Sequence, residues 1–131
     1  MPEKFKTNIL ERSFTSTDLD LFKQWGDYLS SDGQDSKKVT TTQLRKFFGE
    51  IKRIQADFDH SKKSIILLDP KIAYAVGRAK KDAGRSGTKL KDFHDLLSPL
   101  LNNINEEKGK FKNFVSICES IVAYHKAAGG E

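Results

Sequence analysis

Apolar residues recur along the chain at the three- and four-residue spacing of amphipathic helices, and the alternation typical of a half-buried strand does not recur. The spacing predicts helices over residues 17–30, 40–55, 70–82 and 89–104, followed by a C-terminal helix whose apolar stripe runs from Phe111 to His125. We therefore expect an all-α fold, a compact bundle of about five helices.

The ends of these helices are marked by residues that favour caps and turns. Residues 40–42 are threonines that supply an N-cap for the second helix, and the Asp-Pro pair at 69–70 marks the start of the third. Residues 84–87 contain two glycines and form a basic turn before Thr88, which can cap the fourth helix. Pro99 should kink or split that helix, because proline removes one hydrogen-bond donor and clashes with the preceding turn.

Two parts of the chain are less regular. Residues 57–68 are compatible either with a short extra helix or with a linker that ends in a buried apolar tail. Residues 1–39 hold the first predicted helix, with Trp25 in its apolar stripe, and a polar loop. At 131 residues the chain has the size of one ordinary domain, so we expect residues 1–131 to form a single helical-bundle domain.

The cysteine content and the hydropathy bear on where the protein works. Cys118 is the lone cysteine and occupies an apolar position of the C-terminal helix, so we expect a small core residue and a reducing, intracellular setting. No stretch approaches the roughly 18 apolar residues of a membrane span, and the polar N-terminus lacks the apolar segment of a signal peptide. We therefore expect a soluble, cytoplasmic protein.

Positive charge is concentrated in the middle of the chain. Residues 37–91 carry 15 Lys and Arg against five Asp and Glu, a net charge of +10, whereas residues 1–36 have a net charge of −3 and residues 92–131 of −2. A basic segment between mildly acidic flanks indicates a face that binds a polyanion, because a uniformly basic coat would spread the charge evenly.

Two neighbouring helices carry this charge in stripes. At about 100° per residue, Arg45 and Lys52 border the apolar stripe of the second helix. Lys46 and Arg53 lie farther round that helix, opposite the core. The third helix carries a second stripe, formed by Lys71, Tyr74, Arg78 and Lys81. An aromatic side chain between cations suits single-stranded nucleic acid, because a base can stack on the ring while the cations hold phosphates.

The alternative for each of these residues is a solvated charged face, with Tyr74 packed at the edge of the core. The set as a whole favours a polyanion, since the two basic stripes lack compensating acids apart from Glu50. Catalytic chemistry has less support. Asp57, Asp59 and His60 form the only cluster of metal-ligand residue types, and nothing in the sequence indicates a nucleophile with its base. We therefore expect no enzyme, no bound metal and no cofactor.

Three segments of the chain resemble one protein family. They are TTTQLRKFF, followed after one residue by EIKRI, then LLDPKIAYAVGRAK, and the C-terminal FKNFVSICESIVAYHKAAGG. In their order and spacing they are similar to the small helical subunit of type III-A CRISPR effector complexes, the Csm small subunit. The likeness covers roughly residues 40–128, the family-like core, and residues 1–39 match nothing in it.

The resemblance implies a non-catalytic subunit in antiviral defence that stacks in several copies along the duplex of guide RNA and target RNA, while other subunits cut. The implied partners are both RNA strands, the other subunits of the effector complex and neighbouring copies of the same chain. Carried onto this sequence, the implied RNA contacts are Arg45, Lys46, Lys52, Arg53, Lys71 and Arg78, with Lys126 as a further candidate. Sequence specificity would come from guide–target pairing, with the protein holding the backbones.

Two other functions stay open on the sequence alone. One is a stand-alone helical protein-interaction module whose basic faces meet acidic partner surfaces. Copurification of nucleic acid and the salt dependence of binding distinguish this module from an RNA-binding subunit. The other is a small metal-dependent nuclease that uses Asp57, Asp59 and His60, whose activity would disappear on chelation.

Overall fold

Helices make up most of the protein in the computed structural model, which describes residues 1–34, 36–83 and 87–130. The long helices are α1 (Ser16–Leu29), α2 (Thr41–Ala56), α4 (Leu68–Ala83), α5 (Leu90–Asn102) and α6 (Lys108–Ala127). The shorter elements are η1 (Thr7–Glu11), β1 (Ser36–Lys37), α3 (Phe58–Ser61), η2 (Lys62–Leu67) and β2 (Gly87–Thr88). The prediction of an all-α fold with about five packed helices is confirmed.

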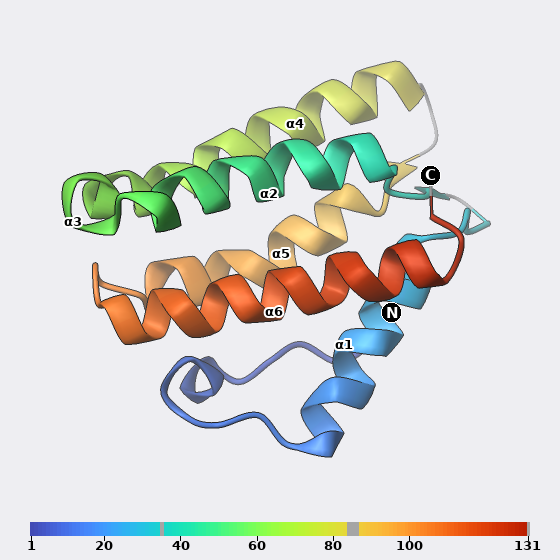
Figure 1. Cartoon of the computed structure of the whole chain (residues 1–131). Coiled ribbons are helices and arrows are strands. Elements are labelled where there is room, and N and C mark those ends of the chain that lie inside the picture. The colour runs from blue at the N-terminus through green and yellow to red at the C-terminus, as the bar shows by residue number, and fades with distance from the viewer. Residues whose placement is uncertain (35, 84–86, 131) are drawn as a thin grey trace.

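The helices pack around α6, which runs through the middle of the bundle (Figure 1). The most extensive contact in the molecule joins α1 to α6, and α2 and η1 also pack on α6, while α4 packs on α5. Figure 1 shows α2 and α4 along one side of the bundle, α5 and α6 next to them, and α1 beyond α6. The two helices that carry the predicted basic stripes are therefore neighbours.

The core is formed by aromatic and branched apolar side chains from all five long helices. Its largest fully buried members are Trp25, Phe22, Phe93, Phe111 and Phe114.

In α2 the predicted apolar stripe is buried only in part. Leu44, Ile51 and Ile54 are buried, whereas Phe47 and Phe48 are half-buried and pack against the edge of the core.

Reciprocal hydrogen bonds fix the starts of α1 and α2. The Thr15 hydroxyl accepts a hydrogen bond from the N–H of Asp18, and the Asp18 carboxylate accepts one from the N–H of Thr15. Thr40 and Gln43 form the same capping box at the start of α2. The N-cap predicted within residues 40–42 is therefore confirmed at Thr40, and both helices begin within one residue of the predicted position.

The predicted start of the third helix is wrong, and of the two outcomes predicted for Pro99, a kink or a split, the split is wrong. The helix expected to start with the pair at 69–70 continues directly from η2 and begins at Leu68. Asp69 therefore lies in the first turn of α4, where its carboxylate is 2.6 Å from Nε2 of His94. Pro99 does not split α5, which runs on to Asn102. Because the proline lies so close to the end of the helix, few backbone hydrogen bonds follow the one that it removes.

Residues 57–68 were ambiguous in the sequence, and all of them except the turn residue Asp57 are helical, as α3, η2 and the start of α4. Only half of the apolar tail is buried. Ile65 and Leu68 are buried, whereas Ile66 and Leu67 are 52% and 51% exposed. A 3₁₀ helix has three residues per turn, so residues three apart share one side and their neighbours face away from the core.

A short parallel pairing of β1 with β2 was not predicted. It joins Ser36 to Gly87 and Lys37 to Thr88, and two-residue strands are too short to show an alternating pattern. The N-cap of α5 is Lys89 and not the predicted Thr88, and the Lys89 side chain makes no capping hydrogen bond. The Thr88 hydroxyl does accept a hydrogen bond at 2.9 Å from the N–H of Leu90, the first residue of α5. Residues 84–86 of the predicted basic turn lie outside the described residues.

Two observations bear on the reducing, intracellular setting and the lack of a membrane span that we expect from the sequence. Cys118 is buried in α6, as predicted, and burial raises the pKa of its thiol, which disfavours a reactive thiolate. Within the described ranges, no helix is both long enough and apolar enough to pass through a membrane.

Candidate nucleic-acid interface

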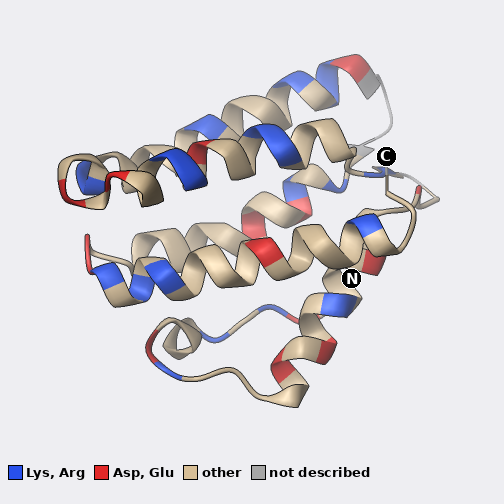
Figure 2. Ribbon diagram, viewed as in Figure 1, with Lys and Arg blue, Asp and Glu red and all other residues tan. Residues whose placement is uncertain are grey.

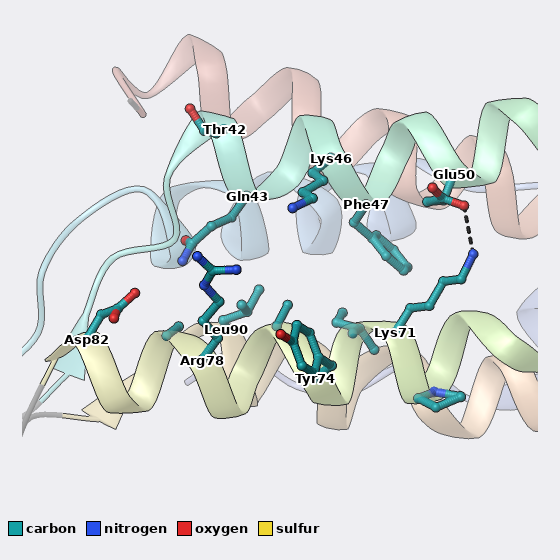
Figure 3. A pocket seen from close by; sticks show the side chains of 14 residues that line it. Thr42, Gln43, Lys46, Phe47, Glu50, Lys71, Tyr74, Arg78, Asp82 and Leu90 are labelled. Carbon is teal, nitrogen blue, oxygen red and sulfur yellow. Dashed lines mark hydrogen bonds and ion pairs between the residues drawn. The ribbon is translucent and has the colours of Figure 1, made fainter.

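A groove of about 660 Å³ lies between α2 and α4 (Figure 3). The two helices run antiparallel, because α3 and η2 reverse the chain between them. Charged and aromatic side chains from both helices line the groove: Lys46, Phe47 and Glu50 from α2, and Lys71, Tyr74, Arg78 and Asp82 from α4. Apolar side chains, among them those of Ile72 and Ala75, and the polar side chains of Thr42 and Gln43 complete the lining.

Helical spacing explains why these side chains share the groove. Lys46 and Glu50 are four residues apart on α2, so they lie on one face of that helix. Lys71, Tyr74 and Arg78 follow one another at three and four residues on α4. These three members of the stripe predicted on α4 therefore form one wall of the groove.

Glu50 neutralises two of the predicted cations. Its carboxylate accepts a hydrogen bond from Nζ of Lys71 at 2.9 Å and forms an ion pair with Arg53, one turn later on α2. The hydrogen bond from Lys71 is the main cause that holds the pKa of the Glu50 carboxyl below its ordinary value. Figure 3 shows the contact with Lys71 as a bridge between the two helices toward one end of the groove.

Lys46 and Arg78 lie on opposite walls of the groove and carry charge that is not compensated in this way. Both side chains are exposed, and neither is within ion-pair distance of an acid among the described residues. Figure 3 shows both side chains reaching into the space between α2 and α4. Asp82, four residues after Arg78 on α4, also lines the groove, but it is not within ion-pair distance of either cation. The two like charges therefore attract an anion to the space between them.

An aromatic side chain from each helix lies beside these cations. Tyr74 is 71% exposed, so the alternative that it packs at the edge of the core is wrong. Phe47 is half-buried, with its ring edge-on to that of Phe93 at a centroid distance of 6.0 Å. The groove thus combines aromatic surface with uncompensated positive charge.

The other two predicted cations of α2 face away from the groove. Nζ of Lys52 lies 4.0 Å from Oε2 of Glu119 on α6 and 5.7 Å from the centre of the Phe48 ring. Arg45 precedes Lys52 by seven residues, so it lies almost on the same line along the helix, on the side toward α6. The arrangement therefore brings Lys46, instead of Arg45 or Lys52, opposite the basic stripe of α4.

Lys81 and Lys126 stand apart from the groove. Lys81 is exposed near the C-terminal end of α4 and Lys126 is exposed in the last turn of α6, and neither lines the groove. Figure 2 shows Lys and Arg spread along α2 and α4, whereas α1 carries several acidic residues. The charge asymmetry of the sequence thus corresponds to different sides of the bundle.

Three charged or aromatic groove residues, Phe47, Glu50 and Asp82, were not predicted as site residues. Phe47 has the spacing of a core residue, and only the position of α4 shows that part of its ring lines a groove. The spacing of Glu50 and Arg53, three residues apart, is a sequence signal for an ion pair on one helix. The contact of Glu50 with Lys71 spans 21 residues and depends on how α2 and α4 pack.

The candidate metal cluster at residues 57–60 is a solvated surface pair. Nδ1 of His60 lies 2.9 Å from Oδ1 of Asp57, and both side chains are exposed. This contact raises the pKa of His60. In the part of the chain that the structure describes, no three His, Cys, Asp or Glu side chains are grouped to hold a metal ion. The nuclease interpretation therefore has no supporting geometry there.

The chain matches a known protein family over most of its length. A family model described as Csm2 Type III-A matches residues 16–131. The match begins at the first residue of α1 and includes both walls of the groove, so it extends beyond the likeness at residues 40–128 found in the sequence. No curated protein and no solved structure matches the chain.

Proposed function

The chain belongs to the Csm2 Type III-A family, the non-catalytic small subunit of the type III-A CRISPR effector complex, and from this premise we propose that its α2–α4 face binds the backbones of guide RNA and target RNA. Other subunits of the complex and neighbouring copies of the chain are the proposed protein partners. We place this activity in the cytoplasm, in keeping with the single buried thiol of Cys118.

The observation that supports RNA binding most directly is the pair of uncompensated cations, Lys46 and Arg78, on opposite walls of one groove. A phosphate between them would interact with both charges at once. Arg78 can also donate two parallel hydrogen bonds to phosphate oxygens, a geometry that a lysine lacks.

The remaining cations have graded roles in this proposal. Arg45 and Lys52 form a second row on the α6 side of α2, where they contact a neighbouring stretch of backbone. Arg53 and Lys71 contribute less in the free protein, because Glu50 already neutralises part of their charge. Lys81 and Lys126 extend the basic surface at its edges.

Contacts to phosphate carry no sequence information, so base pairing between guide and target supplies the specificity.

A charge-reversal experiment tests this proposal. The double variant Lys46→Glu with Arg78→Glu removes both groove cations and should bind single-stranded RNA more weakly than the wild type. The dependence of log K on log salt should also become shallower by about one to two phosphate contacts. The measurement is fluorescence anisotropy of a labelled RNA across a salt series, at equal folded concentration.

Two further variants sharpen the result. Arg45→Glu with Lys52→Glu tests the second row on α2 and should weaken binding to a smaller extent. Lys4→Glu with Lys112→Glu is the matched control, since both lysines are exposed and distant in sequence from α2 and α4. Equal losses in all three variants would show that net charge alone is responsible. Unchanged binding in all three would instead favour the protein-interaction module, with acidic protein partners on the basic face.

A further inference from the structure

The groove between α2 and α4 contains more than a phosphate site. Its charged residues are accompanied by the rings of Phe47 and Tyr74 and by apolar side chains such as Ile72 and Ala75. Phosphate groups are hydrated and gain nothing from apolar walls, so backbone contacts alone do not explain this lining. Its volume of about 660 Å³ lies within the range of sites that enclose small organic ligands.

Tyr74 is the most exposed large aromatic side chain in the described part of the protein. At 71% exposure its ring contributes little to the core, and it lies between Lys71 and Arg78 on the groove wall. Figure 3 shows the Tyr74 ring and the Phe47 ring on the two sides of the groove, near the point that Lys46 and Arg78 approach. Flat apolar surface beside paired cations matches a nucleotide, which is a flat base joined to a phosphate.

We propose that this groove receives one unstacked base of the bound RNA, which stacks on Tyr74 with Phe47 on the opposite side, while Lys46 and Arg78 hold the adjoining phosphate. The inference rests on the proposed RNA-binding function and names a subsite within it. An apolar protein segment fits the same groove less well. It would cover Lys46 and Arg78 without giving either a counter-ion, and a buried unpaired charge is costly.

The subsite should accept any base. Two of its polar lining groups are already used within the protein, because the side-chain oxygen of Gln43 accepts a hydrogen bond from the N–H of Thr40 and the Glu50 carboxylate accepts one from Lys71. Stacking does not require hydrogen bonds to base edges, since every base presents an aromatic face. The groove therefore adds affinity for RNA without adding sequence preference.

The test compares two RNA probes of equal length with the full chain at low salt. One is oligouridine and the other is a fully abasic RNA with the same number of phosphates. The wild type should bind oligouridine about 5- to 150-fold more tightly, the range expected for one stacked base. Tyr74→Ala should abolish most of this preference without weakening the binding of the abasic probe. Tyr74→Phe keeps the aromatic face and should retain the preference.

The outcomes separate this inference from the proposed function. If the wild type binds both probes equally, or if Tyr74→Ala leaves the preference intact, the base subsite is wrong while backbone binding stands. If the wild type binds neither probe, both the subsite and the proposed RNA-binding function fail. If Tyr74→Ala keeps its RNA preference but no longer enters the assembled effector complex, the groove binds a protein segment. Thermal melts check that both variants are folded, which Tyr74's exposure leads us to expect.

Discussion

Two hydrogen bonds join the guanidinium of Arg12 to the carboxylate of Asp18, Nη1 to Oδ2 at 2.6 Å and Nη2 to Oδ1 at 3.0 Å. The same carboxylate accepts hydrogen bonds from the N–H and the hydroxyl of Thr15, so it fastens the segment after η1 to the first turn of α1. The bond from Arg12 is the main cause that lowers the pKa of Asp18 to about 2.

This pair predicts a loss of stability in acid. The folded-state pKa of Asp18 lies below the unfolded value near 4, so its contribution is complete above about pH 4 and is lost as the pH falls toward 2. Asp18→Asn should lower the free energy of unfolding by about 1–2 kcal/mol at pH 7, and the difference from the wild type should shrink between pH 4 and pH 2. Denaturant unfolding of the wild type and of Asp18→Asn between pH 7 and pH 2 measures this difference. A difference that stays constant with pH would contradict the assignment.

The glycines of the long helices should respond to alanine in opposite directions. A Cβ atom at Gly49 or Gly77 meets nothing within 4 Å, so alanine there should raise the free energy of unfolding by about 0.5–1 kcal/mol. At Gly26, where α1 meets α6, a Cβ atom would lie 2.5 Å from Cβ of Tyr124 and 2.7 Å from the backbone nitrogen of His125. Gly26→Ala should therefore cost about 1–3 kcal/mol. Thermal melts of the three variants measure these changes in stability. If Gly26→Ala were as stable as the wild type, α1 and α6 would lie farther apart than the structure shows.

Truncation of a side chain should lower the free energy of unfolding more, the more deeply that side chain is buried. Ile121 is fully buried, so Ile121→Ala should cost about 2–5 kcal/mol. Phe48, which the sequence pattern places in the core, is only half-buried, so Phe48→Ala should cost less, about 1–3 kcal/mol. Lys46→Ala should change the free energy of unfolding by less than about 0.5 kcal/mol. Urea unfolding of these variants tests the order, and equal losses for Ile121→Ala and Lys46→Ala would show that the core face is misplaced.

The sequence predicted the features of the fold that depend on local spacing. Amphipathic stripes repeat with the helical period, and capping boxes join residues three positions apart, so the five helices and the cap at Thr40 could be predicted without knowledge of the packing. The pairing of β1 with β2 could not, because two residues carry no periodic signal.

Local spacing also explains why part of the candidate site could be predicted. The stripe of Lys71, Tyr74 and Arg78 is a local pattern on one helix, and the structure keeps it together on one wall of the groove. Which residues of α2 face that wall depends on the rotation of α2 about its own axis. This rotation is set by tertiary packing, so Lys46 lines the groove whereas Arg45 does not. The ion pair of Glu50 with Lys71 depends on the same packing.

Removal of the Glu50 charge should strengthen RNA binding, because Lys71 and Arg53 would then be free to meet phosphates. Glu50→Gln should raise the affinity for single-stranded RNA about three- to tenfold at low salt and steepen the salt dependence by about one phosphate contact. Its effect on the free energy of unfolding should stay below about 1 kcal/mol, since ion pairs at exposed sites stabilise weakly. Asp20→Asn on α1 changes the net charge by the same amount at an exposed position and is the matched control. An equal gain in both variants would assign the effect to net charge, and no gain in Glu50→Gln would place the RNA away from this groove.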